Sequence, residues 1–151
     1  MVFIKGEPEF FEHGGEKVPY LHFRYEGLVP KYEAGNPHHV MPGGAVHHRT
    51  RYIEDTFKQY DFSKINLRFE QACIIIIHHF KDGRGRDLDN LNSKYLVDAV
   101  RRTAVIKDDS WQHLSHLLFG ARGEEDFVEV YLVSRPALIP LLEAAKILEL
   151  E

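Results

Sequence analysis

The stretch that decides the fold is NLRFEQACIIIIHHF, residues 66–80. Leu67 and Phe69 alternate with polar neighbours, and a run without a polar residue then extends from Cys73 through four consecutive isoleucines. A continuous β-branched run is typical of a strand buried on both faces. We therefore predict a central strand over residues 66–80, and we interpret Cys73 as a small core residue rather than a reactive thiol.

Weaker periodic patterns on both sides of this strand predict the other elements. Residues 1–48 are irregular and rich in Gly, Pro and His, and they end in a long loop over residues 29–48. Together the patterns predict an α+β (mixed α/β) fold, a single compact domain with one mixed sheet and helices packed mainly on one face. The expected elements are a strand at 20–25, a helix at 49–60, a helix at 90–103, a short strand at 104–106, a hairpin formed by 113–119 and 127–133, and a closing helix at 136–148.

Composition indicates the cellular compartment, and it shows how charge is distributed along the chain. The single cysteine excludes an internal disulfide, the start lacks the features of a signal peptide, and no window is long and apolar enough to span a membrane, so we expect a cytoplasmic protein. The formal net charge is −4, but residues 81–107 hold seven basic and four acidic side chains, whereas residues 124–151 hold seven acidic and two basic ones. We expect residues 81–107 to face phosphate, and we do not expect residues 124–151 to do so.

Acidic residues follow two of the predicted strands. Asp87 and Asp89 come after the central strand, and alternate residues of an extended segment point the same way. Asp108 and Asp109 come after the strand at 104–106. If the two strands are parallel neighbours, four carboxylates meet at one sheet edge, and such hard oxygen ligands suit Mg²⁺. Helix capping and ordinary turn chemistry are the competing interpretation, although caps explain one aspartate and leave two like charges side by side.

The sequence also contains adjacent histidines, which raise the hypothesis of a metal site or of DNA contacts. Because neighbouring residues of a strand point to opposite faces, at most one histidine of each adjacent pair can serve a given site. No His-Glu-x-x-His or Cys/His zinc pattern is present. A structural zinc site, or DNA contacts by His47 or His48 beside Arg49 and Arg51, remain alternatives to scattered histidines. The conspicuous histidines are His38-His39, His47-His48, His78-His79 and His113-x-x-His116.

The acidic motifs and the helix between them resemble the signature of the RusA-type Holliday junction resolvases, a family of crossover junction endodeoxyribonucleases. The resemblance covers about residues 65–133. It implies a RusA-like, Mg²⁺-dependent endonuclease, with Mn²⁺ as a possible substitute, that resolves four-way or related branched DNA by phosphodiester hydrolysis during recombination and repair. Such proteins are homodimers, and many are encoded in prophages. The matching pieces are Arg-Asp-Leu-Asp-Asn-Leu at 86–91, Lys94, Asp98-Ala99 and Lys-Asp-Asp-Ser at 107–110.

Carried over residue by residue, the resemblance gives a candidate site. The catalytic set is Asp87, Asp89, Asp109 and Lys94, and Asp108 joins the three aspartates as a candidate metal ligand. The basic residues expected to contact DNA are Arg84, Arg86, Lys94, Lys107, Arg49 and Arg51.

The chain departs from the family pattern at two points. One extra residue separates Asn90 from Lys94, so either the helix begins later, capped by Asn92, or Lys94 points elsewhere. Trp111 displaces to position 112 the Gln that usually follows Asp-Asp-Ser. Two other functions stay open: a catalytically inactive DNA-binding relative, and a metal-binding domain that uses the His-rich loop.

Overall fold

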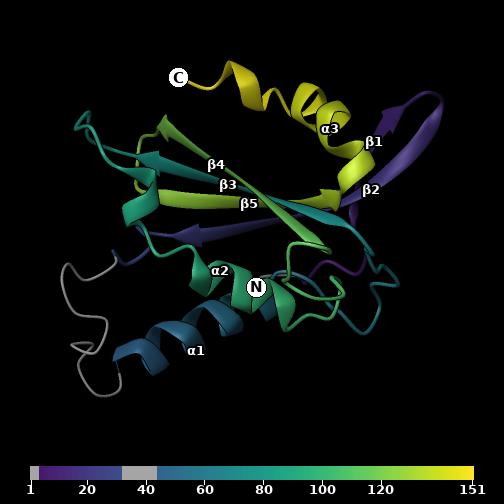
Figure 1. The fold of residues 1–151 in the computed structure, drawn as a ribbon, viewed down its shortest axis with the longest axis horizontal. Coiled ribbons are helices and arrows are strands. Elements are labelled where there is room, and N and C mark those ends of the chain that lie inside the picture. The colour runs from purple at the N-terminus through teal and green to yellow at the C-terminus, as the bar shows by residue number, and fades with distance from the viewer. Residues whose placement is uncertain (1–3, 32–43) are drawn as a thin grey trace.

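The isoleucine run forms the central strand β3 (Ala72–Phe80) in a computed structural model that describes residues 4–31 and 44–151 (Figure 1). All nine residues of β3 are buried. Ile74 and Ile76 belong to the core on one face of the sheet, and Ile75 and Ile77 belong to the core on the other. Full burial of such a side chain contributes about 1.5–3 kcal/mol, which accounts for an apolar run without alternation. The predicted strand is confirmed, but it begins at Ala72 rather than at residue 66.

In the described part of the chain the sheet has five strands in the order β1-β2-β5-β3-β4. The hairpin of β1 (Glu9–His13) and β2 (Glu16–Glu26) turns at two glycines with positive φ, 61° and 80°. Two glycines at a two-residue turn are a hairpin signal. The predicted strand at 20–25 therefore exists as part of β2, whereas β1 lies in a region that we had taken as irregular.

The predicted hairpin of residues 113–119 and 127–133 is wrong in its pairing. Both strands form, as β4 (Leu114–Arg122) and β5 (Phe127–Ser134), but β3 lies between them, parallel to β4 and antiparallel to β5. The link between them crosses the end of β3, where the Gly123 N–H donates to the Phe80 carbonyl at 3.0 Å. A strand that is apolar on both faces is best placed in the sheet interior, where both of its backbone edges are paired.

Helices lie on both faces of the sheet (Figure 1). The two longer ones, α1 (Gly44–Phe57) and α2 (Lys94–Arg101), cover one face, and α3 (Leu138–Ala144) covers the other. This mixed sheet in a single compact domain confirms the predicted α+β class. Within residues 4–31 and 44–151, no helix has the length and apolar character needed to cross a membrane.

The helix boundaries differ from those expected. Helix α1 begins at residue 44, inside the predicted loop, whose residues 32–43 lie outside the described part. The predicted helix at 90–103 is split into a 3-10 turn, η1 (Leu88–Asn90), and α2. The closing helix breaks at Lys146, which has a φ of 55°, and the strand at 104–106 is reduced to one bridge between Ile106 and Phe69. The closing segment consists of η2 (Arg135–Ala137), α3 and η3 (Ile147–Glu149).

Cys73 lies fully buried in the core beneath α3. Burial raises the pKa of its thiol to about 11. A protonated, enclosed thiol is a packing group, which confirms its interpretation as a core residue.

Candidate functional site

Two of the predicted acids line one cavity beside the edge strand β4. This cavity has a volume of about 410 Å³ and is called here the carboxylate cavity. Asp89 comes from η1, and Asp109 comes from the connection between α2 and β4. The cavity thus joins the two acidic motifs that sequence analysis singled out. Its full lining is Asp89, Leu91, Ser93, Lys94, Val97, Asp98, Asp109, His116 and Leu118.

Helix α2, rather than strand pairing, brings these two acids together. The acids were expected to meet if the strand at 104–106 lay as a parallel neighbour of the central strand. Ile106 does bridge Phe69 in parallel, but Phe69 precedes the start of β3, so Asp109 lies at the opposite end of β3 from Phe80. The eight residues of α2 span about 12 Å back along the sheet. Asp89 precedes the helix and Asp109 follows it, and both face the space that the helix borders.

Asp87 does not line the carboxylate cavity. It lines a smaller neighbouring cavity of about 230 Å³ with Arg84 and Arg86, and Leu91 borders both spaces. We had expected Asp87 and Asp89 to point the same way because alternate residues of an extended chain do. Residues 88–90 form a 3-10 turn instead, in which each residue rotates by about 120°, so side chains two apart diverge.

The acids do not behave as helix caps. Asp87 occupies the cap position of η1, yet within the described residues its side chain makes no capping hydrogen bond. Ser93 occupies the cap position of α2, also without a side-chain cap. The capping interpretation therefore does not account for the first acidic motif.

The two adjacent aspartates of the second motif have different surroundings. Asp108 Oδ1 accepts the backbone N–H of Asp109 at 2.8 Å, and this hydrogen bond lowers the pKa of Asp108. Asp109 instead lines the carboxylate cavity, with Oδ2 3.7 Å from Arg101 Nη1. Asp108 thus serves the turn, while Asp109 faces the open space.

The extra residue before Lys94 is accommodated outside the helix. Helix α2 begins at Lys94, and Asn92 Oδ1 accepts the Lys94 backbone N–H at 3.3 Å. Of the two alternatives, the later helix start is the one observed. The shift leaves Lys94 lining the carboxylate cavity.

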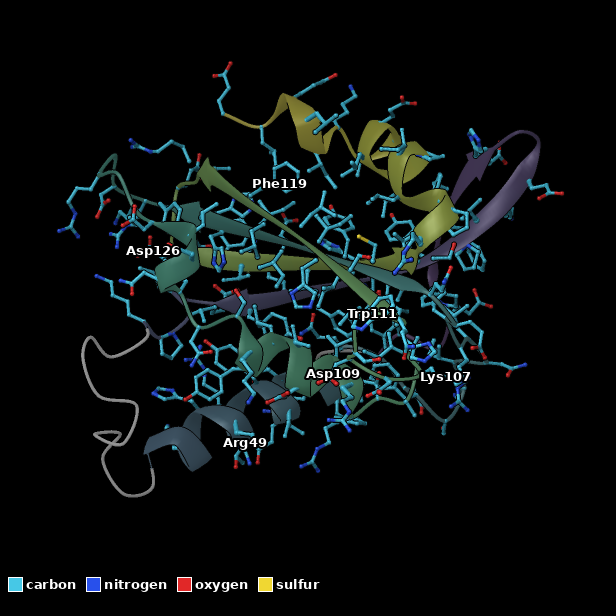
Figure 2. All side chains as sticks on the ribbon, in the orientation of Figure 1. Arg49, Lys107, Asp109, Trp111, Phe119 and Asp126 are labelled. Atoms are coloured by element: carbon cyan, nitrogen blue, oxygen red, sulfur yellow. The ribbon has the colours of Figure 1, made fainter. Side chains whose placement is uncertain are left out.

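A second large cavity, the basic cavity, adjoins the first. It has a volume of about 490 Å³, lies between α1 and α2, and shares Lys94, Asp98 and Asp109 with the carboxylate cavity. Arg49 of α1 also borders it, and Figure 2 shows Arg49 and Asp109 on the same side of the sheet. Its full lining is Arg49, Lys94, Asp98, Arg101, Arg102 and Asp109.

Arg101 and Arg102 were absent from the set of DNA contacts expected from the sequence. They follow Lys94 by seven and eight positions, a spacing that places all three on one face of a helix. This periodicity is the signal that would have found them. Lys107 and Arg51, which were in the expected set, engage protein groups: Lys107 Nζ lies 3.2 Å from Glu70, and Arg51 Nη2 donates to the Glu26 carbonyl at 2.6 Å.

The donor set of the carboxylate cavity fits Mg²⁺. Among the described residues, no three Asp, Glu, His or Cys side chains lie close enough together to form a metal site made by protein alone. Mg²⁺ does not need one, because it keeps several waters and takes one or two carboxylates. Asp89, Asp98 and Asp109 are the acids of this lining, and carboxylate oxygens are ligands that suit Mg²⁺.

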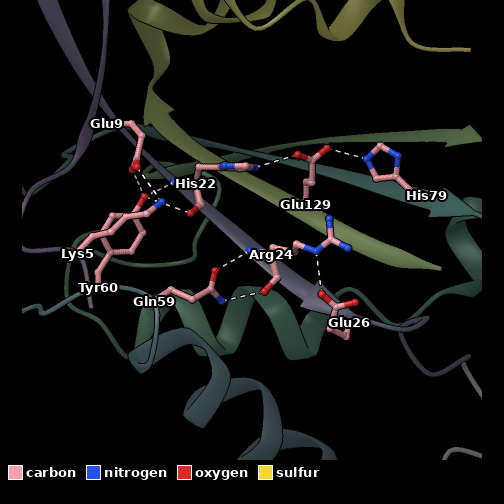
Figure 3. Close-up of polar contacts among 9 residues, drawn as sticks. All are labelled: Lys5, Glu9, His22, Arg24, Glu26, Gln59, Tyr60, His79 and Glu129. Carbon is pink, nitrogen blue, oxygen red and sulfur yellow. Dashed lines mark hydrogen bonds and ion pairs between the residues drawn. The ribbon is translucent and has the colours of Figure 1, made fainter. Parts of the chain in front are cut away.

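The His78-His79 pair is part of the packing, whereas His47 is exposed and His48 is half-buried on α1. Figure 3 shows Glu129 between His22 and His79, with Nε2 atoms 3.0 and 2.6 Å from the carboxylate oxygens, and these hydrogen bonds lower the pKa of Glu129. His78 faces the other side of β3 and is fully buried, as the strand alternation predicts. His116, which lines the carboxylate cavity, was missed as a site residue, although its spacing from His113 had drawn notice. His38 and His39 lie outside the described residues.

No protein-family model matches the chain, and no curated protein matches it significantly.

Proposed function

We propose that this chain is a Mg²⁺-dependent endonuclease that hydrolyses phosphodiester bonds in branched DNA, as RusA-type resolvases do. One observation carries the proposal. Asp89 and Asp109 line a cavity together with Lys94, and Lys94 and Asp109 also line the adjoining basic cavity. Metal-dependent hydrolysis of a phosphodiester in DNA uses acids that hold a metal ion and cations that hold the phosphates.

Each group has a defined role in this proposal. Asp89 and Asp109 hold the ion, Mg²⁺ or Mn²⁺, whereas Asp87 and Asp108, the other two acids expected from the sequence, are assigned no contact with it. The bound ion supplies an activated water and stabilises the leaving oxygen. The Lys94 ammonium neutralises charge on the phosphate between the two cavities. The phosphates next to the cut are held by Arg49, Arg101 and Arg102, which line the basic cavity.

A catalytically inactive DNA-binding protein is the second candidate. It is favoured by the lack, within the described residues, of a preformed group of three metal ligands. The basic cavity serves both candidates equally. The third hypothesis, a metal-binding domain that uses the His-rich loop, concerns residues mostly outside the described part, and zinc in the purified protein would support it.

Incubation with a labelled four-way junction separates the candidates. An endonuclease binds the junction in chelator and cuts it after Mg²⁺ is added. An inactive relative binds it in both conditions and cuts in neither. Absence of binding in both conditions contradicts both candidates, and cutting that persists in chelator contradicts the metal dependence.

We further propose a cytoplasmic homodimer. A two-fold assembly suits a junction that presents two equivalent strands for cutting. Light scattering on the purified protein measures its mass, and a mass of one chain at the concentration that supports cleavage would contradict the dimer.

A further inference from the structure

Trp111 is the only tryptophan of the chain, and it is exposed to solvent. Its exposed fraction is 83%, the highest among the large apolar side chains of the described residues. An indole normally buries a large area, and tryptophans that remain on a surface are enriched at binding sites. An unshielded Trp111 is therefore a candidate contact residue.

The turn that carries Trp111 is fixed to the sheet. The Ser110 carbonyl accepts the N–H groups of His113 and Leu114 at 2.9 and 3.0 Å. The His113 carbonyl accepts the Ala72 N–H at 2.8 Å, so the turn is tied to the first residue of β3. The backbone beneath the indole is thus held in place before any ligand arrives, which lowers the entropy lost on binding.

The same turn adjoins the proposed site. Asp109, two residues before Trp111, lines both the carboxylate cavity and the basic cavity. Arg101 of α2 contacts both acids of the motif, 4.0 Å from Asp108 and 3.7 Å from Asp109. Figure 2 shows Asp109 and Trp111 on the connection from α2 to β4. Trp111 is therefore carried by the same connection as Asp109, beside the surface on which the phosphates of a bound strand are proposed to lie.

We propose that Trp111 is a stacking platform for an unstacked base of the DNA strand held at the carboxylate cavity. The proposal rests on the proposed function and adds the feature of the substrate that is selected. Bases of a continuous duplex already stack on one another, whereas a branch point or a single-stranded segment offers a free base face. Stacking tolerates any base, so Trp111 selects DNA structure rather than sequence. The neighbouring cations favour a polyanion as the occupant.

Intrinsic tryptophan fluorescence tests the stacking role directly, because Trp111 is the only tryptophan and therefore the source of all tryptophan emission. The protein is titrated in chelator with a four-way junction, an oligothymidylate and a continuous duplex, while anisotropy of labelled DNA reports binding separately. We expect the junction and the oligothymidylate to change the emission and to shield it from acrylamide, and the duplex to do so much less.

Three variants make the test quantitative. Trp111→Ala should weaken junction binding about tenfold and reduce the preference for junction over duplex, as expected for loss of one stacked base. Trp111→Phe keeps an aromatic face and should restore most of that affinity. Phe10→Ala is the matched control, because Phe10 is a 48% exposed aromatic residue on the opposite edge strand, and it should bind like the wild type.

The possible outcomes distinguish the stacking role of Trp111 from the proposed endonuclease function. Two outcomes overturn the stacking role alone. In the first, anisotropy shows that the junction binds while the Trp111 emission does not change. In the second, Trp111→Ala binds the junction with wild-type affinity. Absence of DNA binding overturns both proposals. Emission that changes with protein concentration but not with DNA assigns Trp111 to self-association and overturns the stacking role.

Discussion

Two acid-bearing regions on opposite faces of the sheet differ in how their charges are satisfied. On the α3 side of the sheet, Glu129 lies between two histidines at 2.6 and 3.0 Å. On the α2 side, the nearest cationic atom to Asp109 is 3.7 Å away, and Asp89 forms no ion pair within the described residues. The first region is complete without a ligand. The second presents carboxylates and cations to open cavities, as the proposed binding of a metal and a phosphate requires.

The largest expected effect is on Asp109. Asp109→Asn keeps the size of the side chain but removes its charge, so metal binding weakens and cleavage should fall by orders of magnitude. DNA binding should persist or tighten, because a negative charge near the phosphates is gone. Asp108→Asn is the matched control: asparagine can accept the same backbone N–H, so cleavage should remain. Rate measurements that show the reverse order would exchange the roles of the two acids.

His78 is a buried histidine of β3, and its ionisation should make the stability of the protein depend on pH. Burial lowers its pKa from 6.5 to about 4, so between these values the unfolded chain binds more protons than the folded one. The contribution of neutral His78 to the free energy of unfolding is therefore fully present above about pH 6.5. It is lost as the pH falls toward 4, and the loss amounts to about 3 kcal/mol. His78→Leu should flatten the melting temperature across that window. An unchanged pH profile in the variant would contradict this assignment.

Glu129 should affect stability but not catalysis. Glu129→Gln disturbs the hydrogen bonds to His22 and His79 and should lower the free energy of unfolding by about 1–3 kcal/mol. Junction cleavage well below the melting temperature should be unaffected. Glu125→Gln, at an exposed ion pair with Arg24, serves as the control and should change stability by less than about 1 kcal/mol. A specific loss of cleavage in Glu129→Gln would erase the distinction between the two regions.

The smallest expected effect concerns the cations. Arg102 lines the basic cavity, whereas Lys107 contacts Glu70. Arg102→Gln should reduce the slope of log affinity against log salt by about one, and Lys107→Gln should leave it nearly unchanged. Binding isotherms at several salt concentrations measure both slopes. Equal slopes for both variants would show that the basic cavity does not hold DNA.

Local sequence patterns predicted the parts of the fold that depend on neighbouring residues. The isoleucine run identified β3 because an unbroken β-branched run suits only a strand covered on both faces. The Gly14-Gly15 turn carried enough information to predict the first hairpin, and it was overlooked. The insertion of β3 between β4 and β5 has no local signature, since the strand that separates two sequence neighbours comes from elsewhere in the chain.

The candidate site was predictable to a similar extent. The acidic motifs drew attention to Asp89 and Asp109, and helical spacing could have added Arg101 and Arg102. Asp87 was placed with Asp89 only because the turn at residues 88–90 was taken as extended. The meeting of the two motifs depends on the length and the path of α2, which the residue types of the motifs do not encode.

The most direct test is a double-mutant cycle on the initial rate of four-way junction cleavage in Mg²⁺. If Asp89 and Asp109 act together on one ion, Asp89→Asn and Asp109→Asn each remove most of the activity, and the double variant is hardly slower than either. Junction binding in chelator and thermal melting are measured on the same proteins to show that they fold and still engage DNA. Multiplicative losses, or a wild-type rate in either single variant, would contradict a shared metal site in the carboxylate cavity.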